Sequence, residues 1–218
     1  MKLEKFFSAE DLRLVEEAVR EAESRTSGEI VPYAVERSDA YPEATWSAAT
    51  LGALLGVLAA AAVQGLVEIW GVPLAAWIAA PAALGAGGGA LLCGALPELR
   101  RALVPAVTLG DRVAGRAERA FLEHEVFATR ERTGILVFLS LFERRVVVRA
   151  DRGIAAKVAQ AEWDAVVEGI VSGIREGKPG EALARGIRAC GGILERSGVE
   201  RRADDRDELP DGLRTGGP

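Results

Sequence analysis

A single charged residue, Glu68, lies between Glu43 and Glu98, and it separates two long apolar stretches. These stretches, residues 44–67 and 69–97, each exceed the roughly 20 helical residues that cross a hydrocarbon core about 30 Å thick. Neither has a polar face, which argues against two buried helices of a soluble protein. The chain is therefore predicted to place a helical hairpin in a lipid bilayer.

The turn of this hairpin is expected around Glu68. A charge at the bilayer centre costs about 2.5–3.5 kcal/mol on insertion scales, so Glu68 belongs outside the hydrocarbon core. Gly71 and Pro73 favour a chain reversal at this point. The two spans are predicted near residues 46–64 and 74–96.

The placement of arginine predicts the orientation of the hairpin. The turn holds no Lys or Arg, whereas both flanks carry arginines, namely Arg37, Arg100, Arg101, Arg112 and Arg116. Because positive residues are retained on the cytoplasmic side, both termini and the soluble domain are expected to be cytoplasmic. No apolar run preceded by basic residues opens the chain, so no signal peptide is predicted. The expected location is the cell inner membrane, with two spans.

Small residues recur at every fourth position within the predicted spans. They are Ala48, Gly52, Gly56 and Ala60 in the first span, and Gly85 and Gly89 in the second. This spacing lets two helix backbones approach closely. The alternative is chance, since both segments consist largely of Ala, Gly and Leu. We predict membrane packing through Gly52, Gly56, Gly85 and Gly89.

Composition limits the function classes. The net charge of −5 argues against a nucleic-acid partner, which would be held by phosphate neutralisation. Two cysteines, Cys93 and Cys190, cannot build a disulfide framework. The only histidine, His124, nearly excludes a multi-histidine metal site or a Ser-His-Asp arrangement. Arg116 and its basic neighbours are predicted to lie on a solvated or headgroup-facing helix face.

The chain outside the hairpin has the pattern of one small α/β domain. Ser8 and Asp11 form a capping-box pattern, which predicts the start of a helix. Pro32 interrupts the first strand and suggests a sheet edge or a bulge. The expected helices span residues 9–25, 112–130, 161–175 and 180–197, and the expected strands span 29–36, 135–140 and 146–150.

This element order predicts a mixed-sheet layer domain flanked by helices and interrupted by the transmembrane hairpin. The domain would comprise residues 1–43 and 99–200, with the hairpin at 44–98. Residues 201–218 are predicted to form an acidic C-terminal tail without clear periodicity.

Five motifs appear in order along the soluble part. They are Thr26-Ser27-Gly28-Glu29-Ile30, Arg132-Thr133-Gly134-Ile135-Leu136, Ala150-Asp151-Arg152-Gly153-Ile154, Glu162-Trp163 and the acidic run at 204–211. The series resembles the TPM-domain family, also called TPM phosphatase-like proteins, over roughly residues 5–42 and 110–213. The chain departs from the family pattern at Thr133 and Asp207, where relatives often have Asn, and at Ala150, where they often have Gly.

The resemblance implies an α/β sandwich, membrane association and, for some members, phosphatase activity. It also implies a divalent cation site, with calcium favoured. The candidate metal ligands are Asp151, Asp204, Asp205, Asp207, Glu208 and Asp211.

Two acidic residues lie at strand ends independently of the resemblance. Asp151 follows a predicted strand, and carboxylates at the carboxyl ends of strands can face the ligand crevice of α/β sheets. Asp151 can equally cap the short helix that follows. Glu29 could approach the same crevice or simply pair with an arginine.

The acidic run supplies five carboxylates in eight residues, at Asp204, Asp205, Asp207, Glu208 and Asp211. Calcium takes 6–8 oxygen ligands, and clustered carboxylates can supply several. The alternative is a solvated acidic tail, although Leu209 and Pro210 suggest that the segment docks on the domain.

Two functions follow as hypotheses. The first is a membrane-anchored, metal-dependent phosphatase, with Arg132 and Arg152 as candidate phosphate contacts. The second is a non-catalytic accessory module that binds other membrane proteins, with a structural metal at most. The catalytic residues, the substrate, the partner and the oligomeric state cannot be derived from the sequence.

Overall fold

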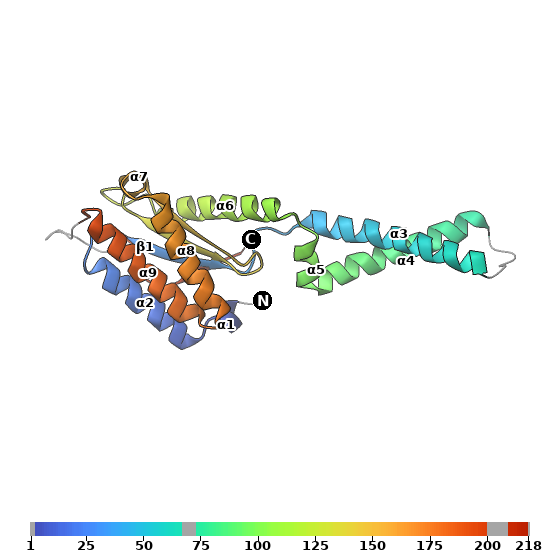
Figure 1. Cartoon of the computed structure of the whole chain (residues 1–218), viewed down its shortest axis with the longest axis horizontal. Helices are drawn as coiled ribbons and strands as arrows, with labels where there is room; N and C mark the ends of the chain where they lie inside the picture. The colour runs from blue at the N-terminus through green and yellow to red at the C-terminus, as the bar shows by residue number, and fades with distance from the viewer. Residues whose placement is uncertain (1–2, 67–72, 200–208, 218) are drawn as a thin grey trace. The chain divides into compact units, whose positions relative to one another are not determined.

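The computed structural model describes residues 3–66, 73–199 and 209–217, and the chain divides into two compact units. One unit combines residues 1–39 with residues 110–218, and the other comprises Ala40–Leu109 (Figure 1). The first unit is the α/β domain and the second is the helical hairpin. The predicted fold class is confirmed.

The α/β domain is built on a four-stranded sheet with the order β3-β2-β1-β4. Its strands are β1 (Ile30–Val35), β2 (Ile135–Ser140), β3 (Arg145–Ala150) and β4 (Arg214–Gly216). β1 pairs in parallel with both β2 and β4, while β2 and β3 are antiparallel. The sheet is therefore mixed, and its central pair joins segments that lie on either side of the hairpin in the sequence.

Helices cover both faces of the sheet (Figure 1). One face packs against α2 (Ala9–Glu23), α8 (Gln160–Arg175) and α9 (Pro179–Arg196), and the other packs against α6 (Ala106–Glu123). Every residue of β1 and β2 is buried. Strands covered on both faces carry continuous apolar runs, which explains why these two segments lack polar alternation.

Local sequence signals begin and end several of these elements as expected. The Ser8 hydroxyl accepts from the backbone N–H of Asp11 at 3.1 Å, and the Asp11 carboxylate accepts from the N–H of Ser8 at 2.8 Å. This reciprocal pair is the predicted capping box. Two short helices, α1 (Leu3–Phe6) and α7 (Arg152–Ala155), complete the domain.

The predicted tail contains a strand that the sequence pattern did not reveal. β4 pairs with β1 in the register Tyr33↔Arg214 to Val35↔Gly216. Because β1 lies between β2 and β4, the prediction that Pro32 marks a sheet edge is wrong. Pro32 is tolerated because β4 begins one residue further along, beside Tyr33. No residue of β4 therefore needs a backbone N–H donor at the proline.

The hairpin unit consists of α3 (Pro42–Leu66), α4 (Leu74–Ala95) and the short helix α5 (Pro97–Ala102). α3 and α4 are long and apolar enough to cross a membrane. Their large side chains are mostly exposed, for example Leu55 at 66% and Leu84 at 78%. These two helices are thus candidate membrane spans.

Glycines bring the backbones of α3 and α4 into direct contact. A Cβ atom added to Gly52 would overlap the carbonyl oxygen of Gly85, and one added to Gly56 would overlap that of Pro81. A Cβ at Gly89 would likewise overlap the carbonyl of Ala48. Only a residue without a side chain allows this separation.

Candidate functional site

Three loops meet at one edge of the sheet, and they contain the first three sequence motifs. The backbone N–H of Ile135 donates to the carbonyl of Glu29 at 2.8 Å, and the N–H of Asp151 donates to the carbonyl of Gly134 at 2.9 Å. The N–H of Gly153 donates to the carbonyl of Arg132 at 2.9 Å. These bonds place the amino ends of β1 and β2 beside the carboxyl end of β3.

The motif glycines allow these loops to touch. A Cβ added to Gly153 would overlap the backbone carbonyls of Glu131 and Arg132, and one added to Gly134 would overlap the carbonyl of Val126. Arg132 itself adopts a left-handed backbone conformation, with φ near 60°. The glycines of the motifs therefore serve close packing of backbone on backbone.

Asp151 lies at the centre of these contacts and is 6% exposed. Its Oδ1 accepts from the N–H of Arg152 at 2.7 Å, which caps α7. Its Oδ2 lies 2.8 Å from Nε of Arg132. These two atoms form an ion pair without the geometry of a hydrogen bond. The Arg132 guanidinium also stacks over the Phe127 ring, with 5.3 Å between its Cζ and the ring centroid.

The directions of the strands change the role that can be assigned to Asp151. The expectation was a carboxylate at the carboxyl edge of the sheet, where α/β sheets bind ligands. β3 runs antiparallel to β2, so the carboxyl end of β3 lies at the amino edge of β1 and β2. The expectation that Asp151 faces a ligand crevice at the carboxyl edge therefore does not apply. In the structure, Asp151 caps α7.

Glu29 is buried at the same edge and lies within electrostatic reach of Arg214. Burial lowers the pKa of Arg214, while the nearby carboxylates of Glu29 and Glu23 act against that change. Oε1 of Glu23 also accepts from the N–H of Ile30 at 2.8 Å. The start of β1 thus holds two carboxylates and one guanidinium in proximity.

The C-terminal acids divide between described and undescribed residues. Oδ2 of Asp211 lies 3.0 Å from Nε of Arg20 on α2, so this acid helps to attach the tail to the domain. Asp204, Asp205, Asp207 and Glu208 lie outside the described residues. Within residues 3–66, 73–199 and 209–217, no three His, Cys, Asp or Glu side chains group closely enough to hold a metal ion.

The two arginines proposed as phosphate contacts differ in their surroundings. Arg132 is engaged by Asp151 and Phe127, whereas the side chain of Arg152 is exposed. Cys190 lies in the core, where burial raises the pKa of its thiol to about 12. Cys190 is therefore protonated at neutral pH and is not a nucleophile.

A buried arginine forms a second polar centre that the sequence analysis misjudged. Arg116 on α6 is 6% exposed, which corrects its predicted position on a solvated helix face. Its Nη2 donates to the Tyr33 hydroxyl at 2.6 Å and to the Gly217 carbonyl at 3.2 Å, and its Nη1 pairs with Glu123 at 3.0 Å. Arg116 therefore attaches the end of the chain to the sheet.

The position of Arg116 could have been found from the helical period. It falls three residues after Val113 and four before Ala120, on the stripe of α6 that faces the sheet. His124 packs on the Tyr33 ring, with 4.7 Å between centroids, and burial lowers its pKa. Burial raises the pKa of Tyr33, so both rings are neutral at pH 7.

A third polar cluster lies at the opposite ends of β1 and β2. Oε1 of Glu143, which is 2% exposed, accepts from the N–H of Ser38 at 2.8 Å. The Ser38 hydroxyl donates to that of Ser140 at 2.9 Å, and the Ser140 hydroxyl donates to Glu143. The three buried side chains satisfy one another and fix the exit from β1.

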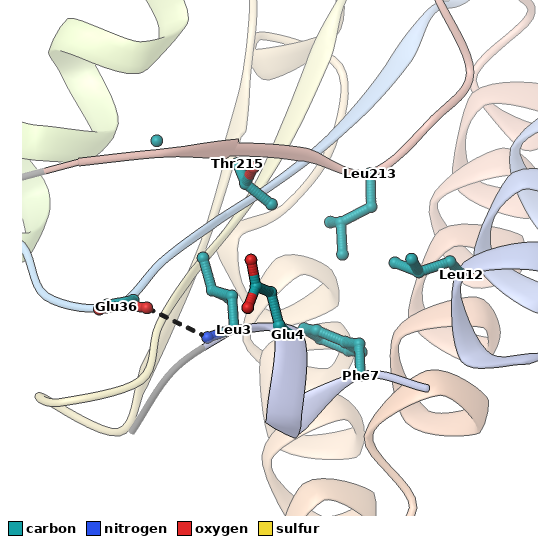
Figure 2. A pocket seen from close by; sticks show the side chains of 8 residues that line it. Leu3, Glu4, Phe7, Leu12, Glu36, Leu213 and Thr215 are labelled. Atoms are coloured by element: carbon teal, nitrogen blue, oxygen red, sulfur yellow. Dashed lines mark hydrogen bonds between the residues drawn. The ribbon is translucent and has the colours of Figure 1, made fainter. Parts of the chain in front are cut away.

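A pocket of about 520 Å³ opens beside β4 (Figure 2). Figure 2 shows Glu4 among apolar side chains, and the N–H of Leu3 donating to Oε1 of Glu36 at 3.3 Å. Of the predicted ligands and phosphate contacts that lie within the described residues, none lines this pocket. Its lining residues are Leu3, Glu4, Phe7, Leu12, Glu36, Leu213, Thr215 and Gly216.

Comparison with known proteins supports the family resemblance over the part of the chain that contains the second, third and fourth motifs. The sequence profile of the TPM domain matches residues 99–193. A similar solved structure is the NMR structure of the BA42 protein from the psychrophilic bacterium Bizionia argentinensis, with a TM-score of 0.59 and 20% sequence identity. The alignment covers 99% of each chain, and at this identity it speaks for the fold. No curated protein matches the chain.

The two contacts of Asp151 predict a graded loss of stability. Asp151→Ala removes the cap and the ion pair, so we expect a loss of about 1–2 kcal/mol, or roughly 2–6 °C in melting temperature. Asp151→Asn keeps a capping oxygen and should lose less than half as much. Circular dichroism of the full chain in detergent micelles measures both. Asp164→Ala, at an exposed carboxylate, is the control, and equal losses in the Ala and Asn variants of Asp151 would contradict the capping role.

Proposed function

Because residues 99–193 match the TPM domain, we propose that this chain acts as a TPM-domain protein at the cell inner membrane, with α3 and α4 spanning the bilayer. Many leucine side chains of these two helices are exposed, which supports the proposal that lipid surrounds them. The arginines on both flanks of the hairpin support a cytoplasmic location for the TPM domain and for both termini.

In this location the TPM domain serves as a non-catalytic accessory module that binds other membrane proteins. The observation that carries this proposal is the state of Asp151, whose two oxygens are occupied by a helix cap and by Arg132. A carboxylate with these partners stabilises the loops in which it lies. The residue that the motifs single out most clearly thus has a structural role.

The remaining reactive groups among the described residues support the same proposal. The hydroxyls of Ser38 and Ser140 lie at the far ends of β1 and β2 from Asp151, roughly 17–20 Å away for strands of six residues. His124 packs on Tyr33, within the Arg116 cluster. A serine, a histidine and a carboxylate do not converge in the part of the chain that the structure describes.

Replacement of the hairpin tests the accessory role. A variant whose residues 42–95 are exchanged for an unrelated two-span hairpin of equal length should keep the TPM domain folded at the membrane. We expect chemical cross-linking in native membranes to show specific membrane-protein partners for the parent chain and at least a ten-fold loss for the variant. Equal profiles for the two chains, or no cross-linked partner for the parent, would contradict the proposal.

A metal-dependent phosphatase activity is the second candidate function. It is favoured by Oδ2 of Asp151, a buried oxygen that accepts no hydrogen bond. A cation at this oxygen would replace the Arg132 guanidinium, and the described residues supply too few ligands for the 6–8 that calcium takes. Asp204, Asp205, Asp207, Glu208 and Asp211 would have to supply the others. A bound divalent cation would neutralise phosphate charge and activate water, and Arg152 would contact the phosphate.

An activity assay decides this second candidate. The purified full chain would be incubated with p-nitrophenyl phosphate in calcium, in magnesium and in chelator. The phosphatase proposal expects cation-dependent turnover that falls at least 100-fold in the double variant Asp151→Asn, Asp205→Asn, while the control Asp164→Asn keeps its activity. Turnover that is absent in all three media, or unchanged in the double variant, would contradict it.

A further inference from the structure

An apolar groove runs along the hairpin unit from α5 toward the middle of α3 and α4. It has a volume of about 530 Å³, within the range of small-ligand sites. Its walls are leucines of all three helices and its floor consists largely of glycines. Leu99 of α5 and Leu103, which follows the end of α5, line the groove, and the lining residues from α4 reach from Leu92 back to Gly85.

Among the lining glycines, Gly88 leaves open space in the floor of the groove, while the others contact the backbone of the facing helix. A Cβ atom added to Gly88 would meet nothing within 4 Å. From Gly85 to Leu92 the groove follows α4 for about 10 Å, at 1.5 Å per residue. An apolar groove that follows a helix over this length can accommodate part of a hydrocarbon chain.

Two arginines lie on the same short helix as the end of the groove. Arg100 and Arg101 follow the lining residue Leu99 in α5 and are half-buried, but they are not themselves lining residues. Nε of Arg100 is buried and has no hydrogen-bond partner among the described residues. Within the part of the chain that the structure describes, the ion pair of Arg101 is a long contact with Glu98, at 3.9 Å. Nε of Arg100 is thus a guanidinium donor that the described residues leave unpaired, beside a second arginine with a long ion pair.

We propose that this groove binds one anionic phospholipid of the cytoplasmic leaflet, with an acyl chain along the glycine floor and its phosphate on Arg100 and Arg101. Guanidinium groups match phosphate in charge and geometry. The cytoplasmic leaflet is anionic, and basic pockets of membrane helices on that side suit such headgroups. This inference rests on the proposed placement of α3 and α4 in the bilayer.

Lipid selectivity tests the proposal. The full chain would be reconstituted in phosphatidylcholine vesicles that contain spin-labelled phosphatidylglycerol or spin-labelled phosphatidylcholine, and the motionally restricted fraction of each label would be measured. We expect phosphatidylglycerol to be preferred by about five-fold or more. The double variant Arg100→Gln, Arg101→Gln should bring the ratio close to one.

Two matched controls separate the groove from general effects. Gly88→Leu fills the groove and should remove the preference, whereas Gly87→Leu, at an exposed glycine that does not line it, should leave the ratio unchanged. The double variant Arg13→Gln, Arg175→Gln changes the net charge equally within the TPM domain and should also leave the ratio unchanged.

Three outcomes would overturn the proposal, and each has a different meaning. Release of the chain from vesicles by alkaline carbonate would remove the membrane placement as well. Retention without a preference for phosphatidylglycerol would overturn only the lipid site. A change of oligomeric state in Gly88→Leu, with the preference intact, would show that the groove receives a second copy of the chain.

Discussion

The parallel pairing of β1 with β2 is the contact on which the rest of the structure depends. The two strands are buried on both faces, and they lie before and after the hairpin in the sequence. A parallel pair needs a long crossover, and here the crossover contains α3, α4, α5 and α6. Because α3 and α4 form a hairpin, the chain leaves and re-enters that unit at the same end, which allows the domain to close.

The motif loops show why a short set of residues identifies this fold. Gly134 and Gly153 permit carbonyl groups to approach the backbone of neighbouring loops, and Asp151 joins its loop to Arg132. These backbone contacts and this ion pair together fix the amino edge of β1 and β2. A residue can therefore be characteristic of a family because it packs against the backbone or caps a helix, whether or not it takes part in catalysis.

Signals that are local in the sequence allowed correct predictions. The near absence of charge between Glu43 and Glu98 predicted two long apolar helices, and the pattern of Ser8 and Asp11 predicted a capping box. The continuous apolar run of β2 predicted a buried strand. In each case the residues that form the element also contain the information that specifies it.

Features that depend on distant partners could not be derived in this way. β4 has the sequence Arg-Thr-Gly, which has no strand pattern of its own and is ordered by β1 and Arg116. The partner of Asp151 depends on the left-handed backbone at Arg132, on another loop. The burial of Arg116 is the exception, because its place on the apolar stripe of α6 was visible in the sequence.

Whether lipid or water surrounds the α3–α4 hairpin can be measured directly. Single cysteines at Leu58 and Leu84, both exposed on the hairpin, and at Leu122, exposed on the TPM domain, would be spin-labelled in reconstituted vesicles. Collision rates with oxygen and with a water-soluble nickel chelate distinguish lipid from water. The account predicts high oxygen and low nickel accessibility at Leu58 and Leu84, with the reverse at Leu122. Nickel accessibility at Leu58 and Leu84 equal to that at Leu122 would contradict it.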